Sequence, residues 1–251
     1  MNYYTILMIT YGAAFATWFF LSRNFEEKLY EKTIQKDNAK SWMDLIVLLV
    51  AGIATLIFGR LYSSGFRVAP IYWGSLKVSE VLNQLFIYSP FILYAIVKPQ
   101  QIWLPPKWKL RLMTGFALGV FACVLFTLLA NKRSVADVVH DTYHIQNFHH
   151  GFQVFIEDLL ICLLLAAFNK AIGNKYLLIT ICVVSFLFGF GHVPSRLESG
   201  LSLTLTIFHS TLDSLLGITA CYLLIRKQDF AWFFPLHFTL DMMQFYSGLQ
   251  I

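Results

Sequence analysis

Seven ionisable side chains lie inside or at the ends of apolar stretches in the last hundred residues of the chain, and their types are those of acid–base chemistry. They are Glu157, Asp158, His192, His209, Asp213, His237 and Asp241. A charged group at the centre of a bilayer costs about 3 kcal/mol or more, so each of these residues needs a local reason to be there. Carboxylates and imidazoles in one site can hold a water molecule and move its proton, or bind a metal ion.

The spacing of these residues predicts which of them meet. His237 and Asp241 are four residues apart, so they share one face of a helix. Glu157 lies near the start of one predicted helix and His192 closes the next, which brings both toward the same end of an antiparallel hairpin. Phe188 precedes His192 by four residues and shares its face. We therefore expect a Glu–His–His–Asp cluster that lines a polar cavity.

The elements that must position this cluster are membrane helices. The chain of 251 residues is 57% hydrophobic and only 13% charged, and its mean hydropathy is +0.62. Soluble domains carry roughly 25% charged residues. This composition excludes a soluble enzyme, a disordered chain and a secreted disulfide scaffold, and it predicts a multi-pass protein of the cell membrane.

Apolar runs of the length needed to cross a bilayer predict eight helices. They cover about residues 2–22, 42–62, 79–97, 112–130, 151–171, 176–191, 201–225 and 229–246. Pro90 should kink the third helix, and loops are expected at 131–150 and 193–200. The predicted fold is an all-α integral membrane protein with one polytopic domain, 1–251, whose motif-bearing core at about 150–246 forms the cavity from helices five to eight.

The net charge of +5 does not predict a nucleic-acid partner. The Lys and Arg residues are scattered between apolar runs, as is usual for the ends of membrane spans, and they form no contiguous basic face. The expected surroundings are the lipid bilayer, and the oligomeric state is left open. The four cysteines lie in apolar runs without the spacing of a zinc site, so we interpret them as small buried thiols.

Three elements on consecutive predicted helices carry a resemblance to a known family. They are Glu157-Asp158-x-x-x-Cys162, Phe188-x-x-x-His192 and His237-x-x-x-Asp241. These elements resemble the EExxxR, FxxxH and HxxxN/D motifs of the CPBP (Abi) intramembrane proteases. That family includes the type II CAAX prenyl endopeptidases and bacterial proteins linked to bacteriocin self-immunity. The resemblance covers residues 152–244, a little over a third of the chain.

The resemblance implies an eight-helix fold and a glutamate-dependent endopeptidase that uses neither a metal nor another cofactor. Glu157 would act as general base on a water molecule, and His192 would hold that water or Glu157. His237 and Asp241 would form the oxyanion hole. The substrate would be a peptide or a membrane-tethered protein, and prenylated CAAX tails are one option.

This chain departs from the family pattern in its first motif. Asp158 stands where the pattern has a second Glu, and Cys162 stands where it has Arg. One alternative is therefore a non-catalytic member that binds a partner in the membrane, for example in bacteriocin immunity.

A second alternative is a metal-dependent membrane hydrolase or an ion carrier. It would use Glu157, His192, His209, Asp213, His237 and Asp241. In the protease interpretation, Phe188, Asp158, His209 and Asp213 are supporting residues. Packing is expected for Phe188, and helix-to-helix hydrogen bonding for His209 and Asp213.

Overall fold

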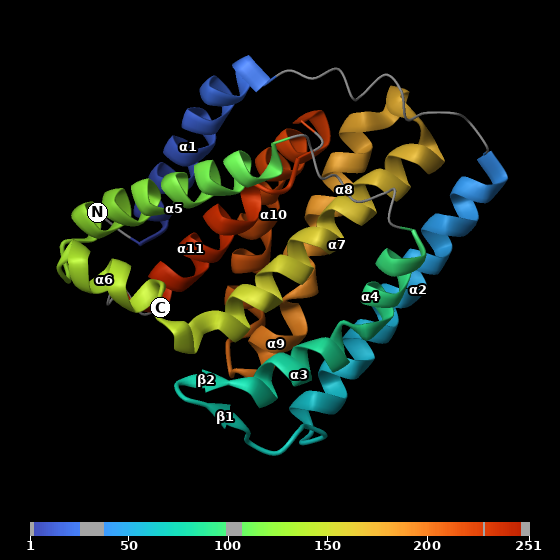
Figure 1. The fold of residues 1–251 in the computed structure, drawn as a ribbon. Helices are drawn as coiled ribbons and strands as arrows, with labels where there is room; N and C mark the ends of the chain where they lie inside the picture. The colour runs from blue at the N-terminus through green and yellow to red at the C-terminus, as the bar shows by residue number, and fades with distance from the viewer. Residues whose placement is uncertain (1–2, 26–37, 99–106, 228, 247–251) are drawn as a thin grey trace.

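The computed structural model describes residues 3–25, 38–98, 107–227 and 229–246, and these residues form an all-α, multi-span membrane protein (Figure 1). The helices are α1 (Tyr3–Leu21), α2 (Asn38–Ser63), α3 (Val78–Ile87), α4 (Ser89–Val97), α5 (Trp108–Ala130), α6 (Val135–Thr142), α7 (Phe148–Ile172), α8 (Leu177–Gly191), α9 (Val193–Glu198), α10 (Leu203–Lys227) and α11 (Phe233–Tyr246). Short 3-10 turns occupy Ser22–Phe25, Ile145–Asn147 and Asn174–Tyr176. Within the described residues, six helices are long and apolar enough to cross a bilayer, and α3 with α4 makes a seventh if they count as one bent span.

Helix α7 is the central element because it belongs to two packed cores. One side of α7 contributes Ile161 and Leu165 to the main core, which also contains buried residues of α1, α5, α8, α10 and α11. Its other side contributes Leu163 and Ala167 to a second core with α2 and α4. A residue on α7 can therefore face either group of helices, depending on its position around the helix.

The third predicted helix is broken, and the break lies two residues before Pro90. Tyr88 ends α3 and begins α4, and the two halves differ in direction by 67°. Proline has no N–H to donate to the carbonyl four residues earlier, and its ring crowds that carbonyl. The Phe86 carbonyl accepts a hydrogen bond from the Ser89 hydroxyl at 2.8 Å instead. After the break, α4 runs back alongside α2 (Figure 1).

The eighth predicted helix is shorter than expected. It was predicted to begin at Asp229, whereas α11 begins at Phe233 and has 14 residues. Asp229 instead accepts a hydrogen bond from the Ala231 N–H at 3.0 Å and pairs with Arg111 at 2.7 Å in a fully buried contact. These contacts form a turn that ties the start of α11 to α5.

Helix α11 packs against α5 at short range because α5 has glycine where the two backbones meet. A Cβ atom on Gly115 would overlap the Trp232 carbonyl, and one on Gly119 would overlap Thr239. The indole of Trp232 stacks on that of Trp18 from α1, with ring centroids 4.5 Å apart. These contacts hold α1, α5 and α11 together on one side of the cavity.

Two segments predicted as loops contain helices. In 131–150, Ser134 begins α6: its hydroxyl accepts the Asp137 N–H at 3.1 Å. Such a cap satisfies a free N–H group and favours a helix start. In 193–200, α9 follows α8 after a single turn residue, His192, with Pro194 in its first turn where the missing N–H does no harm.

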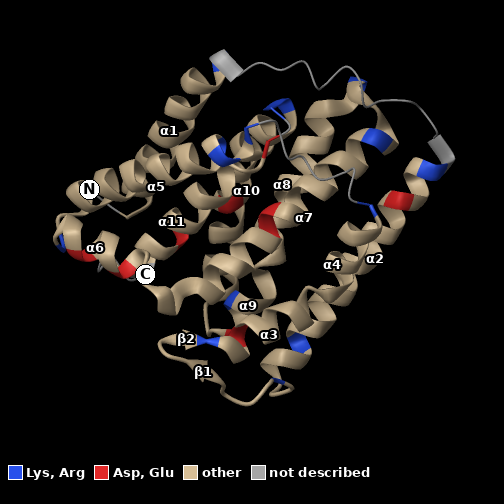
Figure 2. Ribbon diagram, viewed as in Figure 1, with Lys and Arg blue, Asp and Glu red and all other residues tan. Residues whose placement is uncertain are grey.

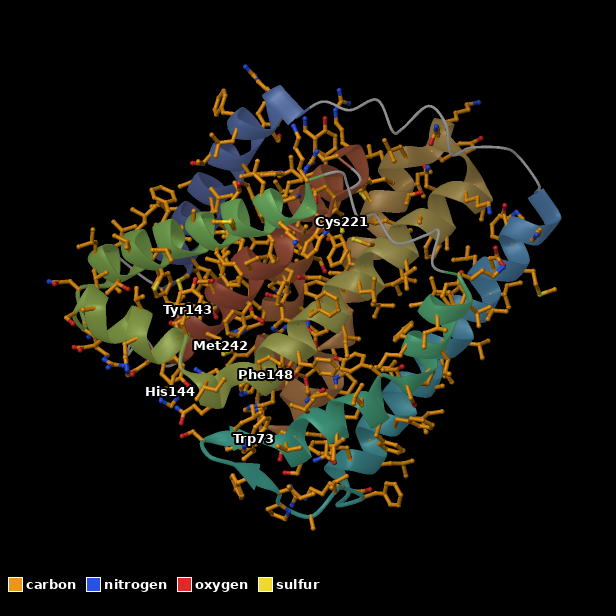
Figure 3. The ribbon with its side chains drawn as sticks, in the orientation of Figure 1. Trp73, Tyr143, His144, Phe148, Cys221 and Met242 are labelled. Carbon is orange, nitrogen blue, oxygen red and sulfur yellow. The ribbon has the colours of Figure 1, made fainter. Side chains whose placement is uncertain are left out.

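Charged groups are distributed as expected for a membrane protein, with most Lys and Arg near helix ends (Figure 2). The short hairpin of β1 (Tyr72–Trp73) and β2 (Leu76–Lys77) exposes 79% of Trp73 at one edge of the molecule, far from Cys221 (Figure 3). Exposed indoles at an edge are typical of the membrane–water interface.

Candidate active site

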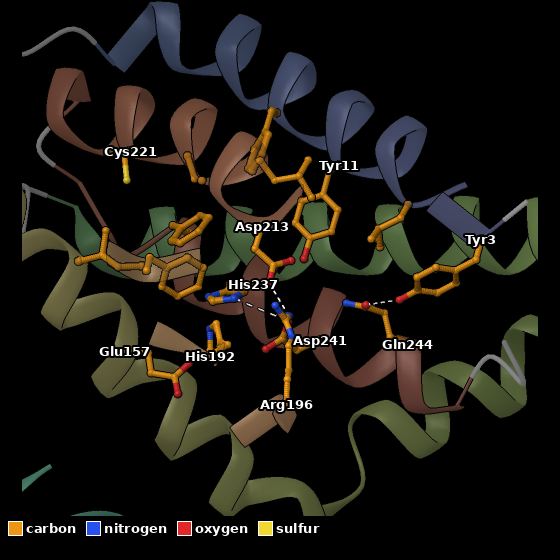
Figure 4. Close-up of a pocket in the computed structure, with 18 residues that line it drawn as sticks. Tyr3, Tyr11, Glu157, His192, Arg196, Asp213, Cys221, His237, Asp241 and Gln244 are labelled. Carbon is orange, nitrogen blue, oxygen red and sulfur yellow. Dashed lines mark hydrogen bonds and ion pairs between the residues drawn. The ribbon is translucent and has the colours of Figure 1, made fainter. Parts of the chain in front are cut away.

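A cavity of about 620 Å³ opens among α1, α7, α8, α9, α10 and α11 (Figure 4). The predicted cluster lines it: the lining includes Glu157, His192, His237 and Asp241, together with Phe188 and Asp213. The structure thus brings all four predicted catalytic residues to one cavity. Helices five to eight of the prediction contribute to it as expected, and α1 and α9 complete it.

Glu157 is half-buried on α7 and is held by two hydrogen-bond donors. The Tyr88 hydroxyl donates to Glu157 Oε1 at 2.7 Å, and Gln153 Nε2 donates to the same oxygen at 2.9 Å. No described residue forms a hydrogen bond with Glu157 Oε2. One oxygen of the carboxylate is therefore fixed, and the other remains available to a water molecule or a substrate.

His237 and Asp158 form a hydrogen-bonded pair inside the bundle. The His237 Nδ1 lies 2.8 Å from Asp158 Oδ1, and Asp158 is completely buried. Asp158 lies next to Glu157 in the sequence but points away from the cavity, because successive residues are 100° apart around a helix. Its role is to hold His237, so that the opposite ring nitrogen, Nε2, faces the cavity.

Asp241 lies beside that free nitrogen but does not bond to it directly. Its Oδ1 is 3.7 Å from His237 Nε2, which is longer than a hydrogen bond. The two groups can therefore both contact a third atom placed between them. A carbonyl oxygen that becomes negatively charged is such an atom, provided that both groups carry a proton to donate.

Aromatic rings hold the two histidines in place. The Phe188 ring meets His192 edge-on at 5.2 Å and His237 at 5.9 Å, between ring centroids. The Phe233 ring stacks on His237 at 5.2 Å. The packing role predicted for Phe188 is thus a contact with both imidazoles, and it restricts their rotation.

Arg196 on α9 brings a cation to the cavity that the sequence analysis did not predict. Its guanidinium donates to Asp213 Oδ2 at 2.5 Å and to the Ser210 hydroxyl at 3.0 Å. Of the described residues that line the cavity, Arg196 is the only Lys or Arg. It balances Asp213, whose predicted helix-to-helix hydrogen bond is this contact with α9.

His209 does not join the site. Its Nε2 lies 2.6 Å from the Tyr4 hydroxyl, so it joins α10 to α1. Among the residues that the structure describes, no group of three or more His, Cys, Asp or Glu side chains is arranged to hold a metal ion. The six-residue metal set proposed as an alternative is therefore not assembled here.

Four polar residues of the cavity were missed by sequence reasoning: Tyr3, Tyr11, Arg196 and Gln244. The Tyr3 hydroxyl donates to Gln244 Oε1, which joins α1 to α11 at one end of the cavity. Arg196 follows His192 by four residues, and this spacing would have indicated a shared face if 193–200 had been predicted as helix. No comparable signal distinguishes Tyr3 and Tyr11 from residues that face lipid.

The groups around the cavity can take a proton from a water molecule and can donate hydrogen bonds to an oxyanion. A carboxylate with one free oxygen, two imidazoles and a second carboxyl group surround a space large enough for water and a chain segment.

Comparison of the chain with protein-family models, with curated proteins and with solved structures found no match.

Proposed function

We propose that this chain is an intramembrane endopeptidase of the cell membrane in which Glu157 activates a water molecule. The observation that carries the proposal is the cavity in which Glu157, His192, His237 and Asp241 meet. The resemblance of the three motifs to the CPBP proteases supports the same function. The substrate is a peptide or a membrane-tethered protein whose backbone enters this cavity.

The proposed reaction uses residues of this chain alone. Glu157 takes a proton from water, and the hydroxide oxygen adds to the carbonyl carbon of the scissile peptide bond. The carbonyl oxygen becomes an oxyanion and accepts hydrogen bonds from His237 and from protonated Asp241. The C–N bond then breaks as Glu157 passes its proton to the leaving nitrogen, which yields a carboxylic acid and an amine; proton transfer from the acid to the amine gives a carboxylate and an ammonium group.

His192 is proposed to hold the attacking water. It lies directly after α8 and is half-buried in the cavity wall, and Phe188 restricts its ring. An imidazole in this position can accept or donate one hydrogen bond to water while Glu157 takes the proton. Orientation of this kind lowers the activation barrier because the entropic cost of positioning the reacting atoms has already been met on binding.

The test compares peptides in membranes and medium from cells that express the wild type, Glu157→Gln or Glu80→Gln at equal abundance. Glu80 is a matched control because it also accepts a tyrosine hydroxyl, that of Tyr62 at 2.9 Å, but lies outside the cavity. We expect specific cleavage products to disappear with Glu157→Gln only, and their new termini define the substrate.

A partner-binding role without catalysis makes the opposite prediction. In that case the peptides match in all three strains, while a phenotype caused by the wild type persists in Glu157→Gln. That result would overturn the catalytic proposal. This alternative rests on the first motif, in which Asp158 and Cys162 differ from the CPBP pattern.

A further inference from the structure

Tyr88 contacts the proposed general base although it is not one of the residues that line the cavity. It lies on none of the three helices that carry the motifs, but at the break between α3 and α4. Its hydroxyl donates to Glu157 Oε1 at 2.7 Å. A residue 69 positions away in sequence is thus bonded to the proposed general base.

The backbone at the break fixes where this hydroxyl lies. The Tyr88 N–H donates to the Gln84 carbonyl at 2.9 Å, and the Tyr88 carbonyl accepts the Ile92 N–H at 3.0 Å. Tyr88 is therefore bonded to both halves of the bent pair. Because both halves also contact α7, the bend aims the ring at that helix rather than at lipid.

A second donor on the same oxygen has a defined orientation. Gln84 Nε2 donates to Gln153 Oε1 at 3.3 Å, so the amide oxygen of Gln153 faces α3 and its nitrogen faces Glu157. The amide thereby joins α3 to the carboxylate in one hydrogen-bond chain. Both donors act on Oε1, and both stabilise the ionised form of a carboxylate.

We propose that Tyr88 is a positioning residue for Glu157, and that its hydroxyl, with the Gln153 amide, occupies Oε1 and leaves Oε2 as the oxygen that accepts the proton of water. The inference rests on the proposed function for its catalytic meaning. Its structural content, that Tyr88 and Gln153 both donate to Oε1 of Glu157, can be tested without a substrate.

The experiment is an infrared pH titration of the purified protein in lipid nanodiscs. The C=O band of a protonated carboxyl group that is missing in Glu157→Gln belongs to Glu157. In Tyr88→Phe, which removes only the hydroxyl, we expect the midpoint of this band to move up by about one pH unit, because the anion loses a donor. Gln153→Met, which removes the other donor with little change in volume, should move it in the same direction.

The matched control is Tyr62→Phe. Tyr62 donates to Glu80 in the same kind of bond, but neither residue lines the cavity. The Glu157 band should titrate in Tyr62→Phe as in the wild type. Equal midpoints in the wild type, Tyr88→Phe and Gln153→Met would overturn the proposal.

Kinetics separate a failure of this inference from a failure of the proposed function. On the substrate defined by the peptide comparison, Tyr88→Phe should lower kcat by about tenfold with little change in KM, and move the acid limb of the rate profile to higher pH. If Glu157→Gln retains full proteolysis, the proposed function fails while the titration result stands. If Glu157→Gln is inactive but Tyr88→Phe behaves as Tyr62→Phe in both measurements, only the positioning role fails.

Discussion

His237 Nδ1 lies 2.8 Å from Oδ1 of Asp158, and this hydrogen bond joins α11 to α7 in the interior of the bundle. Asp158 has no other hydrogen-bond partner among the described side chains, since its Oδ2 is buried and unpaired. When the pair carries two protons, one lies between Nδ1 and the carboxylate, and the other is on Nε2 and faces the cavity. Asp158, which stands where the pattern that this segment resembles has Glu, is thus in direct contact with His237.

Asp158→Asn tests this relationship. The amide oxygen still accepts the Nδ1 proton, but it supplies no negative charge to support a second proton on Nε2. Loss of one donor to an oxyanion slows hydrolysis by about a hundredfold or more, and we expect that decrease in kcat. Asp44→Asn, which alters an acid paired with Lys98 outside the cavity, serves as the control and should retain activity. Full activity of Asp158→Asn would show that His237 does not need this carboxylate.

Cys221 and Cys162 provide a test of the nucleophile. Cys221 on α10 lines the cavity, and Cys162 on α7 is fully buried and does not line it. Because the proposed reaction uses activated water, Cys221→Ala and Cys162→Ala should each retain activity within about twofold, a range typical of small changes in packing. The cleavage rate, normalised to folded protein, is the measurement. Inactivation by Cys221→Ala as complete as that by Glu157→Gln would favour a thiol mechanism.

Alanine substitutions at two glycines of α8, only two residues apart, should differ strongly in their effect on the free energy of unfolding. A Cβ on Gly189 would overlap the Ser214 side chain and the Ser210 carbonyl of α10, whereas one on Gly191 would meet nothing within 4 Å. Gly189→Ala should lower the free energy of unfolding by about 2 kcal/mol through overpacking. Gly191→Ala should leave it nearly unchanged. Thermal unfolding in detergent measures both, and equal melting temperatures would contradict the close packing of α8 and α10.

The effects of substitutions at Arg196 and Asp213 on stability should depend on each other. Arg196→Met leaves the Asp213 carboxylate without its cation, so we expect a lower melting temperature for this variant. The double variant Arg196→Met with Asp213→Asn removes the uncompensated charge and should recover part of the loss. A double-mutant cycle gives the coupling. Strictly additive effects would mean that the contact contributes nothing to stability.

Metal analysis separates the protease from the metal-dependent alternative. We expect purified protein to contain no stoichiometric zinc, and chelator to leave the cleavage rate unchanged. His192→Ala should then abolish activity without altering metal content. Tightly bound zinc that is lost in His192→Ala would instead support the hydrolase or carrier.

The positions of the spans were predictable because apolar length is the main constraint on a membrane helix. All eight predicted segments contain helix, but among the described residues only six helices, or seven with the bent pair, are long and apolar enough to cross a bilayer. The eighth, α11, has 14 residues and is not one of them. The start of α11 was predicted four residues too early because Asp229 resembles a helix start in sequence, yet its carboxylate pairs with Arg111. A distant partner of this kind leaves no local signal.

The cluster itself was predictable from i, i+4 spacing and the order of motifs, which brought His237 and Asp241 to one face. The contributions of α1 and of the α3–α4 break were not. Tyr11 lies in an apolar run, so nothing in its neighbours distinguishes a face that lines a cavity from one that faces lipid. Tyr88 follows the polar Gln84 by four residues, but this spacing does not indicate which helix the two side chains meet. Their roles depend on which helices pack together.

The break at Tyr88 also bears on how the protein is made. The halves of the bent pair have 10 and 9 residues, and about 20 are needed to cross the hydrocarbon core. Neither half can therefore insert as an independent span, and their polar contacts, Gln153 and Glu157, lie on α7. We expect this segment to reach its final depth only after α7 has been synthesised, so that biogenesis and the assembly of the general base are completed in the same step.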